Sequence, residues 1–207
     1  IKSQGVEVKF HKMNVMNEDK RLEAIDNLKK LGLIKCFIHS IAFGTLKPML
    51  SKDKNSSLDA KNIDMTLSVM GSSLVYWVQD LYQNNLLNKG SQIFSMTSAG
   101  GRKQWKSYGA VSMAKAALES ASRQLAIELA PDGIGVNAIQ AGVTDTPALR
   151  KIPGNDKMID FATKHNPSGR LTTPEDIAEY ICLLSQSNNS WLTGNVIRID
   201  GGEDIIG

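Results

Sequence analysis

Short apolar runs alternate along this chain with longer segments of helical periodicity, and this order restricts the fold more than any other feature. Residues 33–43 are almost continuously apolar and have the length of a strand, as does the shorter run 92–96. Runs of this kind are typical of a parallel sheet that is covered on both faces. Between them, residues 61–87 place apolar side chains three and four positions apart, which predicts a long helix. The pattern therefore predicts β-α-β units.

The remaining segments continue this alternation through the chain. We expect further strands at 5–15, 136–140 and 195–200 and further helices at 17–31, 112–129 and 175–186. Strands that alternate with helices indicate an α/β fold, a doubly wound parallel sheet in three layers. The chain has 207 residues, of which 42% are hydrophobic, and this is sufficient for a single domain with a large core. Ligands of such folds bind beyond the carboxyl ends of the strands, so the functional residues are expected there.

Charge and cysteine content exclude several other classes of protein. The net charge is +3, from 24 basic and 21 acidic residues, which is too small to indicate a nucleic-acid partner. No apolar run reaches the roughly 18 residues of a membrane span. Cys36 and Cys182 lie in apolar runs, so we expect two buried thiols without a disulfide. His11, His39 and His165 are scattered, which gives no support for a metal site. We expect a soluble, cytoplasmic protein.

The candidate catalytic residues follow the strand predicted at 92–96. Ser98 stands at the end of this strand, and Tyr108 is followed seven positions later by Lys115 near the start of a helix. Seven helical residues return to within about 20° of the same face, although the two alpha carbons are about 10 Å apart. An ammonium group near a phenol lowers the pKa of the phenol and makes it a better donor to an oxyanion. A surface lysine and a packed tyrosine are the alternative interpretation of this spacing.

The segment SMTSAGGRKQWKSYGAVSMAKAALES, residues 95–120, resembles the active-site segment of the short-chain dehydrogenase/reductase superfamily. Its Tyr-x6-Lys spacing is similar to that of the enoyl-acyl-carrier-protein reductases. Superfamily members with Tyr-x3-Lys spacing would have a tyrosine where this chain has Val111. FIHSIAF (37–43) and AGVTDT (141–146) resemble cofactor-lining segments of these reductases, and 189–202 resembles the last strand of the superfamily. The resemblance spans nearly the whole chain and implies a Rossmann-type fold.

The resemblance implies hydride transfer from NADPH or NADH to a 2-enoyl thioester of acyl carrier protein or coenzyme A, in fatty-acid biosynthesis. Tyr108 would donate a hydrogen bond to the enolate oxygen, and Lys115 would hold the ribose hydroxyls of the cofactor. Asn14 and Val15 resemble the adenine contact. The other implied cofactor contacts are Ser40, Ile41, Ala42, Gly142, Val143, Thr144 and Thr146. A homo-oligomer, either a dimer or a tetramer, is also implied.

Three features depart from the family pattern and leave alternatives open. Ser98 stands where many enoyl reductases have an aromatic residue and ketone-reducing relatives have a catalytic serine. It could polarise a carbonyl, bind the thioester or satisfy the strand end. Met70 falls where the superfamily has an asparagine that organises a relay water. The N-terminal β-α-β unit with its glycine-rich phosphate turn is expected before Ile1 and is missing from these residues. A short-chain dehydrogenase acting on a ketone or alcohol and a non-catalytic nucleotide-binding relative are therefore the alternatives.

Residues 147–170 lie between a cofactor segment and the next helix. Their mixture of apolar and charged side chains predicts a substrate-binding lid over an acyl chain, with an ordinary pair of surface helices as the alternative. Several basic residues here and near Tyr108 could bind an acidic carrier protein or the phosphates of coenzyme A, and a solvated face is the alternative. They are Arg102, Lys103, Lys106, Arg150, Lys151, Lys157, Lys164 and Arg170.

Overall fold

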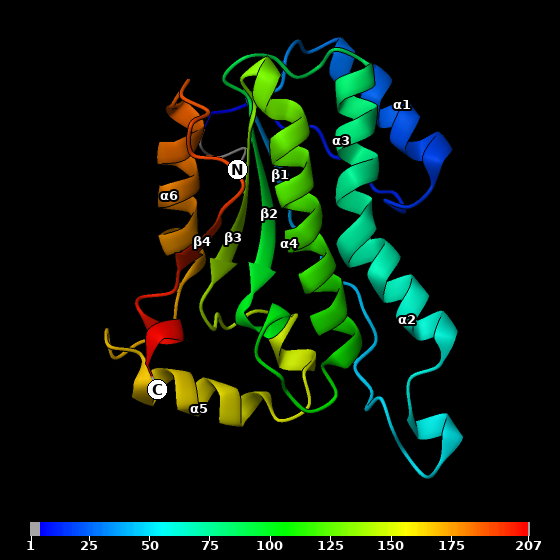
Figure 1. Ribbon diagram of the computed structural model, residues 1–207, viewed down its shortest axis with the longest axis vertical. Helices are drawn as coiled ribbons and strands as arrows, with labels where there is room; N and C mark the ends of the chain where they lie inside the picture. Colours follow the sequence, from blue (N-terminus) through cyan, green and yellow to red (C-terminus); the bar gives the residue numbers. More distant parts are fainter. Residues whose placement is uncertain (1–4, 207) are drawn as a thin grey trace.

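The computed structural model describes residues 5–206. Their strands form one sheet in the order β1-β2-β3-β4, and every neighbouring pair is parallel. The strands are β1 (Cys36–His39), β2 (Gln92–Ser98), β3 (Gly135–Ala141) and β4 (Val196–Ile199). Because the strands are parallel, all four carboxyl ends lie at the same end of the sheet, as Figure 1 shows.

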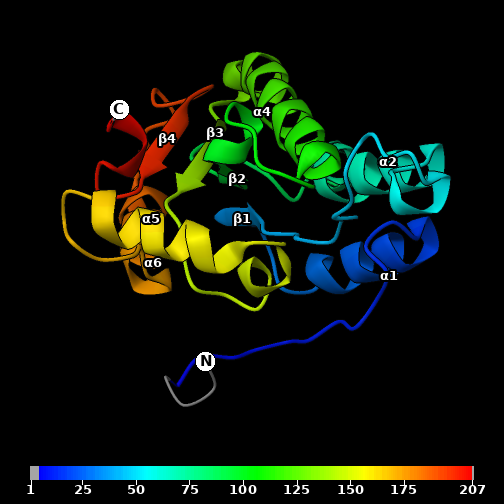
Figure 2. The same ribbon diagram turned by 90° about the horizontal axis from the view of Figure 1, so that it is seen from below.

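Helices lie on both faces of this sheet. They are α1 (Glu18–Lys29), α2 (Ala60–Leu67), α3 (Ser73–Gln83), α4 (Gly109–Leu129), α5 (Asn155–His165) and α6 (Pro174–Gln186). Figure 2 shows α4 and α2 on one side of the sheet and α6 on the other, and α1 lies with α3 and α4 because its Ile25 enters their core. The predicted doubly wound α/β fold is confirmed. No helix within residues 5–206 is long and apolar enough to cross a membrane.

Successive side chains of β2 enter two separate cores. Ile93 packs against Leu74 of α3 and Leu118 of α4 in the larger core. Phe94, its neighbour, points to the other face and packs against Ile177 of α6. A strand covered on both faces needs apolar residues at consecutive positions, since adjacent side chains point to opposite sides. The continuous apolar run in the sequence therefore has a direct structural cause.

The helix predicted at 61–87 is interrupted by a π-helical turn at Ser68–Ser72, between α2 and α3. Asp59 caps α2 by accepting a hydrogen bond from the Asn62 amide at 2.7 Å. The two faces of the segment serve different clusters, because Met70 packs near Tyr108 while Leu74 enters the larger core. Such π turns are frequent near functional sites. The helical segment also ends earlier than predicted, at Gln83.

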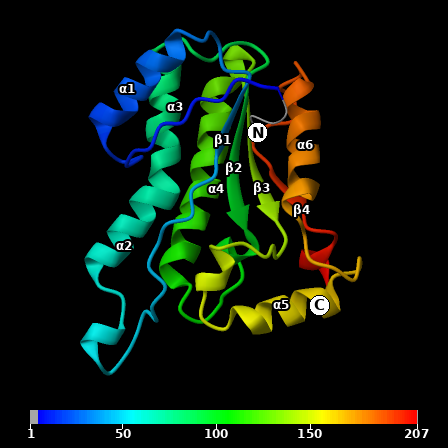
Figure 3. The same ribbon diagram turned by 180° about the vertical axis from the view of Figure 1, so that it is seen from behind.

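The strand predicted at 5–15 is wrong. These residues form irregular backbone, and Val6 and Phe10 are 54% and 76% exposed. Figure 3 shows this segment passing across the sheet toward α1 without joining an edge. An alternating pattern indicates a strand only when a neighbouring strand supplies hydrogen-bond partners, and within the described residues β1 pairs with β2. The segment that contains Val6 and Phe10 therefore does not pair with any strand of the described sheet.

The prediction that both cysteine thiols are buried is wrong for Cys182. Both cysteines are free, but Cys182 is exposed and Cys36 is half-buried. Cys182 lies on α6, where Ile177 and Ile181 face the sheet four residues apart. The residue that follows Ile181 is turned about 100° around the helix axis, which carries it toward solvent. An apolar neighbourhood in the sequence therefore did not mean burial in a helix.

Candidate active site

Three segments predicted to bind a cofactor or substrate follow the carboxyl ends of neighbouring strands. Residues 40–42 follow β1, Ser98 ends β2, and residues 142–146 follow β3. Ser98 lies opposite Ala141 in the register of β2 and β3, which brings the second and third segments together. Ser40 and Ala42 are exposed and Ile41 is half-buried. In Figure 1, α5 crosses below these strand ends, where a ligand of a parallel sheet would lie.

Tyr108 and Ser98 lie beside one another at the end of β2. Tyr108 directly precedes α4 and packs against Met70 and Val111. A side chain at Gly100 would come within 2.5 Å of Tyr108 Cε1 and 3.2 Å of Ser98 Oγ, so the glycine permits this close approach. Within the described residues, the buried Ser98 Oγ has no hydrogen-bond partner.

The phenol of Tyr108 is suited to donate a hydrogen bond at neutral pH. Burial raises the pKa of this phenol above its ordinary value, and the nearby Ser98 hydroxyl opposes the rise. The phenol therefore keeps its proton in the neutral range. This direction differs from the lowering expected from the spacing of Tyr108 and Lys115 alone, because removal from water outweighs other influences on the phenol.

Lys115 is a buried amine anchored to the strand that carries Ser98. It lies in the second turn of α4, is 7% exposed, and its Nζ donates to the Met96 carbonyl at 2.7 Å. Burial lowers its pKa to about 8, while the charge of Glu119 raises it. Glu119, one helical turn further on, is also 7% exposed and accepts from Thr97 Oγ1 at 2.7 Å. Lys115 and Glu119 thus fix adjacent residues of β2, and sequence reasoning missed Glu119.

His39 is a structural residue at the end of β1. Its Nε2 lies 2.7 Å from Ser73 Oγ of α3, and the side chain is buried. Burial and the charge of Lys115 lower its pKa to about 4, so the imidazole is neutral under ordinary conditions. Within residues 5–206, no group of three or more histidine, cysteine, aspartate or glutamate side chains is arranged to hold a metal ion.

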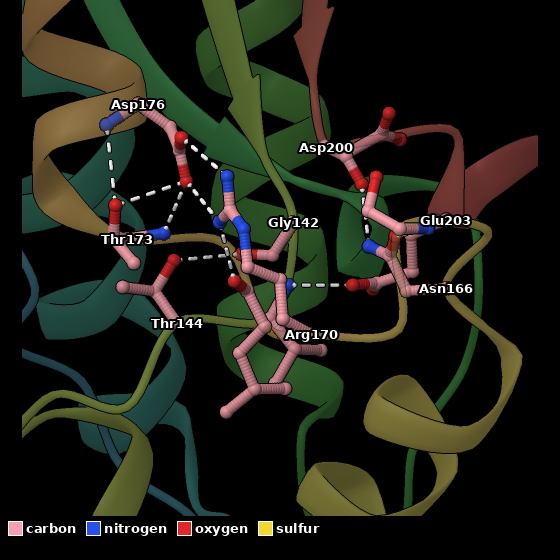
Figure 4. Close-up of polar contacts among 11 residues, drawn as sticks. Gly142, Thr144, Asn166, Arg170, Thr173, Asp176, Asp200 and Glu203 are labelled. Atoms are coloured by element: carbon pink, nitrogen blue, oxygen red, sulfur yellow. Dashed lines mark hydrogen bonds and ion pairs between the residues drawn. The ribbon is translucent and has the colours of Figure 1, made fainter.

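The backbone of the segment after β3 is held by hydrogen bonds at both the amide and the carbonyl of Val143. The Val143 amide donates to Glu203 Oε2 at 3.0 Å, and the Val143 carbonyl accepts from the Thr172 amide at 3.1 Å. Thr144 Oγ1 donates to the Gly142 carbonyl at 3.0 Å (Figure 4). Thr146 Oγ1 accepts from the Leu149 amide at 3.2 Å, which leaves its own proton free to donate.

Gly142 occupies a position without room for a side chain. A Cβ there would overlap Thr172 Oγ1 and lie 3.0 Å from Glu203 Oε2. We expect Gly142→Ala to lower the free energy of unfolding by about 1–3 kcal/mol in urea denaturation, since overpacking forces side chains or backbone to move. Thr172→Ala is the matched partner because it removes the overlapping oxygen. The double variant should recover part of the loss, and equal stability of wild type and Gly142→Ala would refute the steric argument.

Asn14 and Val15 lie in the turn that leads into α1. Asn14 Oδ1 accepts from the Met16 amide at 3.0 Å, and its carbonyl accepts from the Asn17 amide at 3.0 Å. These contacts are local and prepare Asn17 to cap α1. In the described part of the chain, no hydrogen bond joins this turn to the strand ends. The adenine contact assigned to Asn14 and Val15 stays a prediction.

Residues 147–170 form a short 3-10 turn at Leu149–Lys151, followed by α5. Leu149 and Ile152 are buried, and the indole of Trp105 donates to the Pro153 carbonyl at 3.2 Å. This bond joins the segment to the loop that precedes Tyr108.

Four of the basic residues singled out in the sequence already have acidic partners, since Arg102 and Lys103 form ion pairs with Asp204 and two arginines bind other carboxylates. Arg150 donates to both carboxylate oxygens of Asp145, at 2.7 and 2.6 Å, and Arg170 donates to both oxygens of Asp176, at 2.6 and 2.8 Å. Lys151 is also exposed but, within residues 5–206, forms no ion pair. The charges of the two arginines are therefore largely matched within the chain.

Comparison with known proteins identifies one family consistently. The family model described as "Enoyl-(Acyl carrier protein) reductase" matches residues 1–203. The NADH-dependent enoyl-[acyl-carrier-protein] reductase FabI of Aquifex aeolicus is 32% identical over 190 residues, which cover 89% of this chain and 69% of that protein. The FabI of Buchnera aphidicola is 32% identical over 169 residues, covering 82% of this chain and 64% of that protein. This chain thus spans about two thirds of the length of these curated relatives.

Solved structures give the same result. The crystal structure of the Aquifex aeolicus VF5 enoyl-[acyl-carrier-protein] reductase (NADH) matches with a TM-score of 0.81 and 28% identity, over 93% of this chain and 74% of that chain. The Bacillus cereus enoyl-acyl carrier protein reductase, solved with NADP+ and an indole naphthyridinone, matches with a TM-score of 0.84 and 25% identity. That match covers 94% of this chain and 75% of the Bacillus cereus chain.

Proposed function

Because this chain belongs to the enoyl-(acyl carrier protein) reductase family of the short-chain dehydrogenases/reductases, we propose that it reduces the 2,3 double bond of a 2-enoyl thioester with NADH or NADPH, in fatty-acid biosynthesis. One observation carries the proposal. A protonated phenol, Tyr108, and an unpartnered hydroxyl, Ser98, lie side by side at a strand end, with the buried amine of Lys115 anchored two residues before Ser98.

The residues at the strand ends fit a nicotinamide cofactor. Thr146 has a free hydroxyl proton, and exposed residues follow β1. We propose that residues 40–42 contact the middle of the cofactor and that Lys115 holds its ribose hydroxyls. Residues 142–146 would receive the carboxamide. When bound, the cofactor supplies the hydride.

The chain's own residues would stabilise the charge that develops on the thioester oxygen. Tyr108 would donate a hydrogen bond to this oxygen, a contribution of about 3–4 kcal/mol in a site without water. The positive charge of Lys115 would strengthen the same interaction, and Ser98 would be a second donor. Because the apolar Met70 packs near Tyr108, the carbon next to the thioester would take its proton from solvent rather than through a side chain there.

Reduction of a ketone is the second candidate, and the free hydroxyl of Ser98 favours it. Oxidation of NADH and of NADPH should be followed with crotonyl-CoA and with acetoacetyl-CoA. The proposal requires turnover of crotonyl-CoA. Turnover of acetoacetyl-CoA alone would replace it with a ketone reductase. Cofactor binding without turnover of either thioester would favour a non-catalytic nucleotide-binding relative.

We further propose that residues 147–170 close over the acyl chain, in a cytoplasmic enzyme that assembles from two or four identical chains. The position of α5 across the strand ends and the bond from Trp105 to Pro153 support the lid, because they link its movement to the loop before Tyr108. The exposed Lys151 would then be available to an acyl carrier protein or coenzyme A.

A further inference from the structure

A short acidic turn follows β4 and has a fixed geometry. Asp200 Oδ1 accepts from the Gly202 amide at 3.0 Å, and its Oδ2 accepts from the Asp204 amide at 3.1 Å. Asn166 Nδ2 donates to the Asp200 carbonyl at 2.9 Å, so the turn is also tied to the end of α5 (Figure 4). Residues Glu203–Ile205 then form one 3-10 turn. The backbone that carries the two neighbouring acidic side chains, Glu203 and Asp204, is therefore fixed in place.

Glu203 binds the segment after β3. Its Oε2 accepts a hydrogen bond from the Val143 amide at 3.0 Å, and the Val143 carbonyl accepts one from the Thr172 amide. The preceding residue, Gly142, is fixed by a hydrogen bond from its amide to the Ile199 carbonyl at 3.3 Å. The backbone of 142–143 is thus held by hydrogen bonds from three separate parts of the chain, of which Figure 4 shows the one from Glu203. Without the carboxylate, the Val143 amide would lose the acceptor that the structure gives it.

Asp204 binds the loop that joins Ser98 to Tyr108. Its side chain is 2% exposed and forms ion pairs with Arg102 and, at 2.8 Å, with Lys103. Gln140 of β3 donates to it at 3.1 Å. Burial alone would raise the pKa of this carboxyl, but hydrogen bonds from Lys103, Gln140 and Arg102 outweigh burial and hold it below the usual range. Asp204 is therefore a charged anchor.

The two acids connect the loops on which the reaction would depend. We propose that Glu203 and Asp204 are positioning residues, Glu203 for the backbone that receives the nicotinamide carboxamide and Asp204 for the loop between Ser98 and Tyr108. This inference rests on the proposed function. Hydride transfer depends on the placement of the donor relative to the carbonyl oxygen and its hydrogen-bond donors, and small displacements lower the rate strongly.

The test compares Glu203→Leu with Glu203→Gln in the protein at its full encoded length. ADP-ribose shares the adenine half of NADH but lacks nicotinamide, so it reports binding outside the loop after β3. We expect Glu203→Leu to weaken NADH binding about tenfold, equivalent to about 1.4 kcal/mol, with ADP-ribose binding unchanged. Glu203→Gln keeps an oxygen that accepts the Val143 amide, so its NADH affinity should stay within about twofold of wild type.

The conservative variant also separates positioning from stability. Burial raises the pKa of Glu203, so its charged form is disfavoured in the fold and the neutral glutamine removes that cost at neutral pH. Glu203→Gln should therefore unfold at the wild-type temperature or above it. Glu179→Leu, at an exposed glutamate of α6, is the control for loss of a surface charge and should change neither binding constant.

Asp204→Asn is a second variant, which tests the positioning role of Asp204 even if Glu203→Leu does not fold. It should lower kcat about tenfold with little change in NADH affinity, because it loosens the loop before Tyr108. Wild-type NADH binding by Glu203→Leu, equal weakening of NADH and ADP-ribose, or wild-type kcat in Asp204→Asn would overturn the inference. A wild-type protein that binds NADH but reduces no enoyl thioester would instead remove the proposed function, while the NADH and ADP-ribose comparison would still be readable.

Discussion

Tyr108→Phe is expected to lower kcat for reduction of crotonyl-CoA by about 100-fold or more. The variant removes only the hydroxyl, so the ring still packs against Met70 and Val111. The developing oxyanion would lose a donor in a site without water, where one such donor contributes roughly 100- to 1000-fold to kcat. Steady-state rates at saturating NADH measure the effect.

Cofactor affinity serves as the internal control for this variant. NADH titration should give the wild-type dissociation constant, because the assigned role of Tyr108 is in the reduction step. Tyr82→Phe is the matched substitution elsewhere, since the Tyr82 hydroxyl donates to Asp132 Oδ2 at 2.7 Å on the surface. If Tyr108→Phe keeps more than about a third of the wild-type rate, Tyr108 is not the main donor, and Ser98→Ala then decides whether Ser98 is.

Lys115→Met is expected to lower kcat/KM by about 100-fold and also to weaken NADH binding. Methionine replaces the buried ammonium with an apolar chain of similar length. The ribose hydroxyls would lose a charged hydrogen bond, worth about 1.5–3 kcal/mol. Lys29→Met, at the exposed end of α1, is the matched control and should leave both constants unchanged.

The same lysine gives a pH dependence with a defined sign. Because burial lowers its pKa to about 8, wild-type kcat/KM should fall as the pH rises through about 8 and the amine loses its proton. Lys115→Arg, which stays protonated, should lack this alkaline fall. An identical alkaline profile in Lys115→Arg would show that another group causes it.

Stability should change in the opposite direction to activity. The ordinary pKa of 10.5 exceeds the folded value of about 8, so the unfolded chain binds more protons between these limits. The protonated amine therefore disfavours folding below pH 8, and this cost is relieved as the pH rises toward 10.5. Lys115→Met should consequently unfold at a higher temperature than wild type at neutral pH, which separates lost function from misfolding.

Burial explains how much of the fold could be predicted from the sequence. β2 and α6 were located to within a few residues, because each must place apolar side chains at fixed intervals against a covering layer. The segment 5–15 has the alternation of a strand but not its neighbour, and pairing partners are a property of the whole chain. The π turn at Ser68–Ser72 could not be predicted either, since it changes the helical phase without changing composition.

The residues of the candidate site also divide into those that the sequence predicted and those that it did not. Ser98, Tyr108 and Lys115 lie within one short segment, so their spacing carried the signal. Glu203 could not be found by spacing, because its partner Val143 is 60 residues away in the chain. Glu119 had a usable signal, since it stands four residues after Lys115 on the same helix and so shares its buried face.

The π turn sets a limit on how this helical segment can change in length. A π turn closes i→i+5 hydrogen bonds and so holds one residue more than an α-helical turn. Loss of one residue from Ser68–Ser72 can therefore be absorbed by conversion to an α turn, which keeps the flanking helices in phase. An inserted residue has no such outlet and would rotate Leu67 relative to Leu74 by about 100°, so that the contacts of the helix with Tyr108 and with the larger core could not both be kept.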